Sequence, residues 1–353
     1  MTLVFPAVGH AAAEYLRSAR LRGEHVVCAA SVPNDEFVSE FGCLQRLPFI
    51  HDDDFESVFF ALVEGHSISR LFCPVSTVYA FMNQFISARG LDIQLVGFSP
   101  VRQQMELHRQ LMARATRLLT LVELCAAGAP ALSLREVAGV LRQASLIYGE
   151  SNDDKLAAMM GIFAAVPKGD VVEIGSLMGR SAFVLLYLAR RHEVGSLLTI
   201  DPWSARECVQ QQSPGALQSV TDEWDFEVLS EGFAVNFVPF GSGDHAHLRK
   251  PSNEAFPLYA NGNAITSSEG APVVYSGGIS VIHIDGNHDY GCVKNDCVLW
   301  LDKMLPESWL ILDDYVWTHG DGPYRTGNEL LQDQSERIEC AFVCGKALFV
   351  KFR

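Results

Sequence analysis

Two short motifs place acidic side chains directly after apolar stretches. Asp285 stands in Ile282-His-Ile-Asp-Gly-Asn-His-Asp-Tyr290, and Asp313 and Asp314 stand in Leu310-Ile-Leu-Asp-Asp-Tyr315. Both apolar stretches are expected strands of one parallel sheet, and ligands bind beyond the carboxyl ends of such strands. Carboxylates that share a crevice repel one another unless a cation or a proton intervenes. Hard oxygen ligands suit magnesium or calcium better than zinc, so the three aspartates are candidate ligands of a divalent cation.

Histidines beside these motifs are candidate proton acceptors. His288 follows Asp285 by three residues, and a neutral imidazole can take a proton from a hydroxyl whose pKa a bound cation has lowered. The alternative is that His288 only caps the turn before a helix that is expected from Gly291. His319 is a second candidate base, whereas His283 lies in mid-strand and reads as a satisfied core histidine.

A glycine turn follows the apolar run that begins at Val171. Its residues are Glu173-Ile-Gly-Ser-Leu-Met-Gly-Arg-Ser181, with an expected helix from Arg180 to His192. A dinucleotide site would show G-x-G-x-x-G, whose second glycine lets backbone amides approach a pyrophosphate. This turn has a different spacing and an acid two residues before its first glycine. We therefore expect a ligand that carries no pyrophosphate.

Alternating apolar and helical runs organise the chain into three parts. Residues 1–100 predict a small α/β domain, 101–165 a helical bridge or cap, and 166–353 a second α/β domain. Continuous apolar runs between helices indicate a parallel sheet, and residues 339–352 predict a closing hairpin. The third strand of the second domain is expected at 237–240, and an active-site loop or an insertion at 250–278.

Composition excludes several classes of protein. Lys and Arg number 27 against 42 Asp and Glu, a net charge of -15 that disfavours nucleic acid as a partner. The nine cysteines include no C-x-x-C pair, which favours reduced thiols in the cytoplasm over disulfides or structural zinc. The first residues lack a charged leader, and no apolar run is as long as a membrane span, so neither secretion nor a membrane is expected.

The glycine turn together with Asp201, which ends the run Leu198-Thr-Ile-Asp201, resembles the class I S-adenosylmethionine-dependent methyltransferases over residues 152–353. The resemblance implies a Rossmann-like domain with a mostly parallel seven-stranded sheet and an antiparallel last strand. It implies ribose hydrogen bonds to Asp201, close approach at the glycines, and contacts of the methionine end with Glu173 and Ser181. The residues expected at S-adenosylmethionine are Glu173, Gly175, Ser176, Gly179, Ser181, Asp201, Trp203, Asp244 and His245. For Trp203, packing against a helix is the alternative, and for Asp244 and His245 a solvated loop.

The pattern I-D-G-N-H-x-Y followed by L-D-D-Y resembles the macrocin O-methyltransferase-like and cephalosporin-hydroxylase-like branches of that fold. Carried over, it makes Asp285, Asp313 and Asp314 ligands of magnesium or another divalent cation, with Asp285 and His288 as the catalytic residues. Catechol O-methyltransferases, which are more distant, have lysine at the position of His288. The implied activity is O-methylation of a hydroxyl on a small molecule or a saccharide.

Two alternatives stay open, a hydroxylase-like enzyme on the same fold and a binding or assembly protein. Self-association into a homo-oligomer is open as well. Residues 1–100, with Leu95-Val-Gly-Phe-Ser-Pro100 before a helix, weakly resemble the domain that precedes the nucleotide-binding lobes of ATP-grasp enzymes. Since no such lobes follow, a scaffold that docks or shapes a substrate is favoured over a working nucleotide site.

Overall fold

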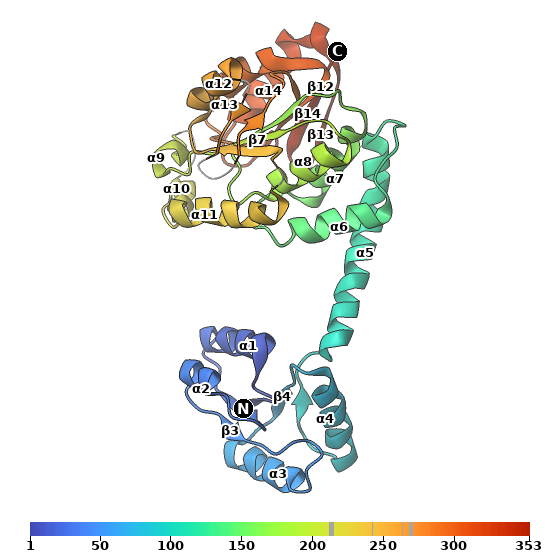
Figure 1. Cartoon of the computed structure of the whole chain (residues 1–353), viewed down its shortest axis with the longest axis vertical. Helices are drawn as coiled ribbons and strands as arrows, with labels where there is room; N and C mark the ends of the chain where they lie inside the picture. The colour runs from blue at the N-terminus through green and yellow to red at the C-terminus, as the bar shows by residue number, and fades with distance from the viewer. Residues whose placement is uncertain (212–214, 242, 263, 268–270) are drawn as a thin grey trace. The chain divides into compact units, whose positions relative to one another are not determined.

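A computed structural model of the chain describes residues 1–211, 215–241, 243–262, 264–267 and 271–353 (Figure 1). The chain divides into two compact units, Met1–Gln110 and Leu111–Arg353. The division falls inside the long helix α5 (Pro100–Cys125). The boundaries that the sequence predicts, after residues 100 and 165, stay predictions.

Unit 1 is a small α/β domain. Its strands β1 (Thr2–Val4), β2 (Val26–Ala30), β3 (Gln45–Arg46), β4 (Arg70–Phe72) and β5 (Gln94–Leu95) are parallel, in the order β3-β2-β1-β4-β5. Apolar side chains of α1 (Gly9–Leu21) and α2 (Asp35–Phe41) pack on one face, and those of α3 (Phe55–His66) and α4 (Ser76–Arg89) on the other. Burial on both faces explains why β2, Val-Val-Cys-Ala-Ala, is apolar throughout.

Unit 2 has the mostly parallel seven-stranded sheet that the sequence predicts. Its order is β13-β14-β12-β11-β6-β7-β8. The parallel strands are β6 (Asp170–Ile174), β7 (Leu197–Ile200), β8 (His245–Leu248), β11 (Ile279–Ile284) and β12 (Met304–Leu312). The closing hairpin of β13 (Ile338–Cys344) and β14 (Ala347–Phe352) joins the sheet through β14, which runs antiparallel to β12.

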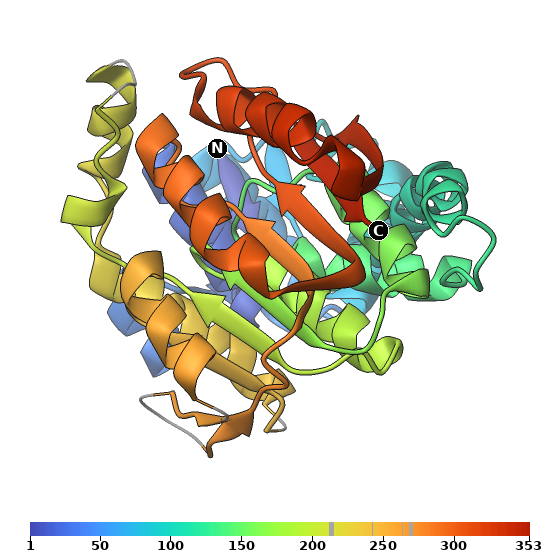
Figure 2. The ribbon, with the colours of Figure 1, turned by 90° about the horizontal axis from the view of Figure 1, so that it is seen from above.

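Helices cover both faces of this sheet (Figure 2). One apolar cluster holds α6 (Leu134–Ala144), α7 (Asp153–Ile162), α8 (Arg180–Arg191) and α11 (Phe226–Phe237). The other holds α12 (Ser252–Asn261), α13 (Tyr290–Trp300) and α14 (Gly322–Asp333). Because side chains alternate along a strand, Val171 and Val281 face the first cluster, and Glu173 and His283, two residues on, point the same way.

Shorter elements complete unit 2. They are the helices α9 (Ala205–Cys208) and α10 (Gly215–Thr221), the 3₁₀ turns η1 (Phe163–Ala165), η2 (Val238–Phe240), η3 (Leu301–Lys303) and η4 (Ser335–Arg337), and the strand pair β9 (Ala264–Ile265) and β10 (Val273–Val274). Every helix that the structure describes is too short or too polar to cross a bilayer.

One expectation about secondary structure is wrong, and a second segment holds more regular structure than a loop. Residues 237–240 form the end of α11 and η2 instead of the third strand, because Pro239 cannot donate a hydrogen bond to a sheet ladder. The third strand is β8, which starts at His245. The expected loop at 250–278 contains α12 and the pair β9 and β10, although its positions 263 and 268–270 lie outside the described residues.

Gly175 and Gly277 provide a matched test of the glycine turn. Their φ angles are +84° and +81°, but a Cβ on Gly175 would overlap the carbonyl oxygen of Asp285, whereas one on Gly277 meets no atom within 4 Å. The left-handed backbone should cost either alanine variant about 1–2 kcal/mol. The overlap should cost Gly175→Ala about 1–3 kcal/mol more. Urea denaturation measures both free energies of unfolding, and equal losses would contradict the close approach.

Candidate functional site

The ends of four parallel strands bring most of the predicted site residues to one edge of the unit 2 sheet. Gly175, Asp201, Asp285 and Asp313 directly follow β6, β7, β11 and β12. Each backbone N–H donates to a carbonyl that ends the neighbouring strand, for example Asp285 to Ile174 (2.7 Å) and Asp313 to Ile284 (2.9 Å). The ladder therefore extends one residue past each strand and fixes where these residues lie.

Asp201 organises the glycine turn. Its Oδ2 accepts from the backbone N–H of Ser176 (2.9 Å) and Leu177 (3.0 Å), and its Oδ1 accepts from that of Trp203 (2.8 Å). Burial raises the pKa of Asp201, and the three amide donors, which lower it, offset burial only in part. Asp201 at the end of β7 therefore holds the glycine turn after β6 in place, although Asp201 and Ser176 lie 25 residues apart in the chain.

The other residues of this half of the site are buried close to the turn. Ser176 is buried, and its hydroxyl has no hydrogen-bond partner among the described residues. Ser181 is the second residue of α8, after Gly179 at φ +94°. Trp203 donates from Nε1 to the carbonyl of Leu177 (2.9 Å), and its ring packs on Phe233, so the packing alternative for this residue holds in the structure.

Asp244 and His245 do not lie at this edge, which corrects the expectation that they adjoin the cofactor. The third strand begins at His245 instead of ending before it, so both residues lie at the amino end of β8. Asp244 pairs with Arg190 in the last turn of α8 (Nε to Oδ2, 2.6 Å). His245 lies against Phe237, and burial lowers its pKa to about 3. At the opposite edge, Asp244 thus forms an ion pair, and His245 packs on an aromatic ring and lies 3.0 Å from Thr199 Oγ1.

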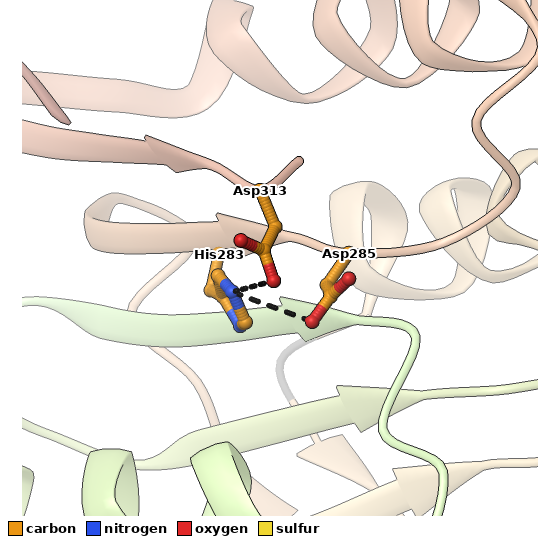
Figure 3. Close-up of side chains that lie close together, drawn as sticks. All are labelled: His283, Asp285 and Asp313. Carbon is orange, nitrogen blue, oxygen red and sulfur yellow. Dashed lines mark ion pairs between the residues drawn. The ribbon is translucent and has the colours of Figure 1, made fainter. Parts of the chain in front are cut away.

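The acids after β11 and β12 form two groups that share Asp285. In the inner group, one ligand atom each of His283, Asp285 and Asp313 lies within 4.8 Å of the others (Figure 3). In the outer group, Asp285, His288 and Asp314 satisfy the same limit. The sequence-predicted aspartates and His288 therefore come together, but neither group contains all three aspartates.

Lys155 is a site residue that the sequence analysis missed. It lies in the first turn of α7, where Asn152 caps the helix, and its side chain is 1% exposed. Its Nζ contacts Asp313 Oδ2 and lies 3.5 Å from both Asp285 Oδ2 and His283 Nε2. Burial lowers the pKa of Lys155, but Asp285 and Asp313 raise it by more than burial lowers it. The group therefore stays an ammonium ion. The available signal was a lysine that directly precedes an apolar stretch.

The inner group continues into the sheet. His283 Nδ1 lies 3.0 Å from Oε1 of Glu173, whose side chain is fully buried. His283 is thus a buried histidine with a carboxylate partner, as expected, but it also contacts the cluster. Burial and the charge of Asp313 raise the pKa of Asp285. Burial acts the same way on Asp313, but Lys155 outweighs it and the pKa of Asp313 falls.

His288 lies between two carboxylates in the outer group. Its Nε2 is 3.7 Å from Asp285 Oδ1, and its Nδ1 is 3.7 Å from Asp314 Oδ2. Neither ring nitrogen has a hydrogen-bond partner among the described residues. Lys346, in the hairpin turn, lies 2.5 Å from Asp314 Oδ1. The other candidate base, His319, is exposed, and its ring is 5.5 Å from that of Trp317, which itself packs on His288.

The sheet order and its antiparallel last strand define unit 2 as a class I S-adenosylmethionine-dependent methyltransferase fold. Residues 172–315 match a protein family described as "Methyltransferase domain". These residues include the glycine turn and all three aspartates.

The chain is also similar to several solved structures, three of which are an O-methyltransferase, a methyltransferase and a putative O-methyltransferase. NovP is 13% identical, with 68% of this chain and 99% of that chain covered and a TM-score of 0.39. The calicheamicin methyltransferase CalS11 is 12% identical, with 72% and 94% covered and a TM-score of 0.35. A putative O-methyltransferase from Klebsiella pneumoniae is 15% identical, with 78% and 98% covered and a TM-score of 0.33. A comparison with curated proteins gave no match.

Removal of the buried ammonium should destabilise unit 2. Lys155→Met leaves Asp285 and Asp313 without their cation, and breaking a buried ion pair from one side costs about 3–5 kcal/mol. Lys294→Met is the control, since Lys294 pairs with Glu329 at 2.7 Å and both side chains are 37% exposed. Such a surface pair contributes about 0–1 kcal/mol. Urea denaturation with EDTA present compares the variants, and a small loss for Lys155→Met would show that a proton replaces the cation.

Proposed function

We propose that the chain transfers the methyl group of S-adenosylmethionine to a hydroxyl oxygen of a small molecule or a saccharide. The observation that carries the proposal is the juxtaposition of the Asp201-held glycine turn with the carboxylate cluster at one edge of a methyltransferase sheet. The two parts adjoin, because Gly175 approaches the backbone of Asp285 closely. A cofactor at the turn would therefore present its methyl group beside the cluster.

The turn supplies the groups that S-adenosylmethionine needs. Gly175 and Gly179 adopt left-handed backbone conformations, which let the turn pack closely against Asp285 and against Phe233 and Phe237. Ser176 offers a buried hydroxyl with no partner among the described residues, and Ser181 lies where the free amides of α8 can hold a carboxylate. Asp201 is proposed to accept from the ribose hydroxyls and Glu173 to face the ammonium group. Trp203 stabilises the turn through the hydrogen bond from its Nε1 to the carbonyl of Leu177.

The cluster fits a divalent cation by its donors. Asp285, Asp313 and Asp314 offer hard oxygen atoms, and Asp313 Oδ1 is buried with no partner among the described residues. Magnesium or another hard divalent cation suits such a set. When bound, it would lower the pKa of an acceptor hydroxyl. A buried polar atom of this kind would otherwise stay unsatisfied at a cost in free energy.

Transfer is an in-line displacement at carbon. The acceptor oxygen forms the new bond to the methyl carbon as the bond from that carbon to sulfur breaks, and S-adenosylhomocysteine leaves. We propose that His288 takes the acceptor's proton, since Asp285 and Asp314 flank its ring and stabilise the imidazolium that forms. In line with this, those carboxylates outweigh burial and raise the pKa of His288. Orientation and charge then supply most of the rate enhancement.

Two aspartates from opposite edges of the sheet test the cofactor site. Asp201→Ala should weaken S-adenosylhomocysteine binding by about 1–3 kcal/mol, because hydrogen bonds to a charged acceptor are lost. Asp244→Ala removes the Arg190 partner at the other edge and should leave the affinity unchanged. Isothermal titration calorimetry measures both. Equal affinities in the two variants would refute this cofactor site.

Chelation and a histidine variant test the chemistry. With labelled S-adenosylmethionine and a panel of hydroxylated small molecules and saccharides, EDTA should abolish methyl transfer and leave S-adenosylhomocysteine binding intact. His288→Ala should lower the rate by about 10²–10⁴-fold, the range for a general base. His319→Ala, an exposed control, should retain the rate. Turnover that survives EDTA would point to a cation-free site with an aspartate base, and absence of any methylated product would favour a hydroxylase-like or binding function.

A further inference from the structure

The cluster contains two positions where a cation can lie. The inner position is surrounded by His283, Asp285 and Asp313, and the outer one by Asp285, His288 and Asp314. Asp285 faces both, with Oδ2 toward the inner position and Oδ1 toward His288 in the outer one. A single ion cannot be held by all three aspartates as they stand, because neither group includes both Asp313 and Asp314.

Lys155 fills the inner position. Its ammonium contacts Asp313 and lies 3.5 Å from Asp285 Oδ2 and from His283 Nε2, so it occupies the place between the atoms that would bind a metal. The side chain is 1% exposed and enters from a packed helix, which leaves it no route to solvent. A divalent ion beside this fixed positive charge would be repelled strongly at low dielectric.

The outer position has no such resident cation. Asp285 Oδ1 and Asp314 Oδ2 each lie 3.7 Å from His288, and one ligand atom from each residue lies within 4.8 Å of the others. Lys346 pairs with the remaining oxygen of Asp314, but its side chain is 35% exposed and can move into solvent. Magnesium is often held by only one or two protein carboxylates, with waters and substrate in its other positions.

We propose that Asp285 and Asp314 hold the divalent cation, and that Asp313 and Lys155 form a closed ion pair outside its ligand set. The inference rests on the proposed function and departs from the ligand set of three aspartates. In the alternative ligand set of three aspartates, the cation would bind Asp313 through Oδ1, which has no partner among the described residues.

Two charge-neutral double variants of the full chain separate these ligand sets. Lys155→Met with Asp313→Asn removes the inner ion pair, and Lys346→Met with Asp314→Asn removes the outer one. Each removes one lysine and one aspartate, so the formal charge of the cluster is unchanged. In the inner double variant Asp285 loses Lys155 but keeps His283 at 3.8 Å and His288 at 3.7 Å. Calorimetric titration with MnCl₂ measures the binding of the metal alone. Circular dichroism and S-adenosylhomocysteine binding show that each variant is folded.

We expect the wild-type chain to bind one Mn²⁺ and the inner double variant to keep its affinity. The outer double variant should lose about tenfold or more, since even residues behind the ligands of a metal site cost 10–100-fold. Equal losses in both double variants would overturn the proposal in favour of three aspartates. A wild-type chain that binds S-adenosylhomocysteine but no Mn²⁺ would overturn it while the proposed methyltransferase stands. Failure to bind S-adenosylhomocysteine would instead refute the proposed function.

Discussion

The ammonium of Lys155 lies in the interior of unit 2 between two carboxylates and an imidazole, and several elements are held in place by that contact. Charges removed from water destabilise a fold unless they are paired at close range. The pairing requires α7 to start at the level where β11 and β12 end, because Lys155 is in its first turn and Asp285 and Asp313 directly follow those strands. His283 carries the contact on to Glu173 in β6.

The closing hairpin is part of the same arrangement. Gly345, at φ +55°, lies so close to the start of α7 that a Cβ there would overlap the cap residue Asn152 and the backbone of Lys155. Its neighbour Lys346 reaches Asp314 from the same turn. Lys155 at the start of α7 and Lys346 in the hairpin turn therefore lie on neighbouring backbone segments. They pair with the consecutive residues Asp313 and Asp314. The antiparallel strand β14 begins directly after the hairpin turn, so its position in the sheet places Gly345 and Lys346 against the site.

Sequence reasoning found the parts of the site that local patterns specify. The expected ends of β6, β7, β11 and β12 each carry their acid or glycine, and a parallel sheet gathers such ends at one edge whatever the intervening chain does. Local patterns gave no partner for Lys155, since Asp313 lies 158 residues further along and only the packing of α7 brings them together. The third strand was misplaced for a related reason. Residues 237–240 are apolar enough for a strand, and the proline among them was the overlooked signal.

Exposure across the cluster indicates which groups can take part in exchange with solvent. Lys155 and Asp313 side chains are 1% and 5% exposed, whereas those of His288 and Asp285 reach 13% and 25%. In the proposed reaction an acceptor would approach the more exposed side of the cluster, which His288 and Asp285 form. The more deeply buried pair of Lys155 and Asp313 would then position Asp285 from the other side. Proton transfer and cation exchange would then occur on one side of Asp285, and structural charge pairing on the other.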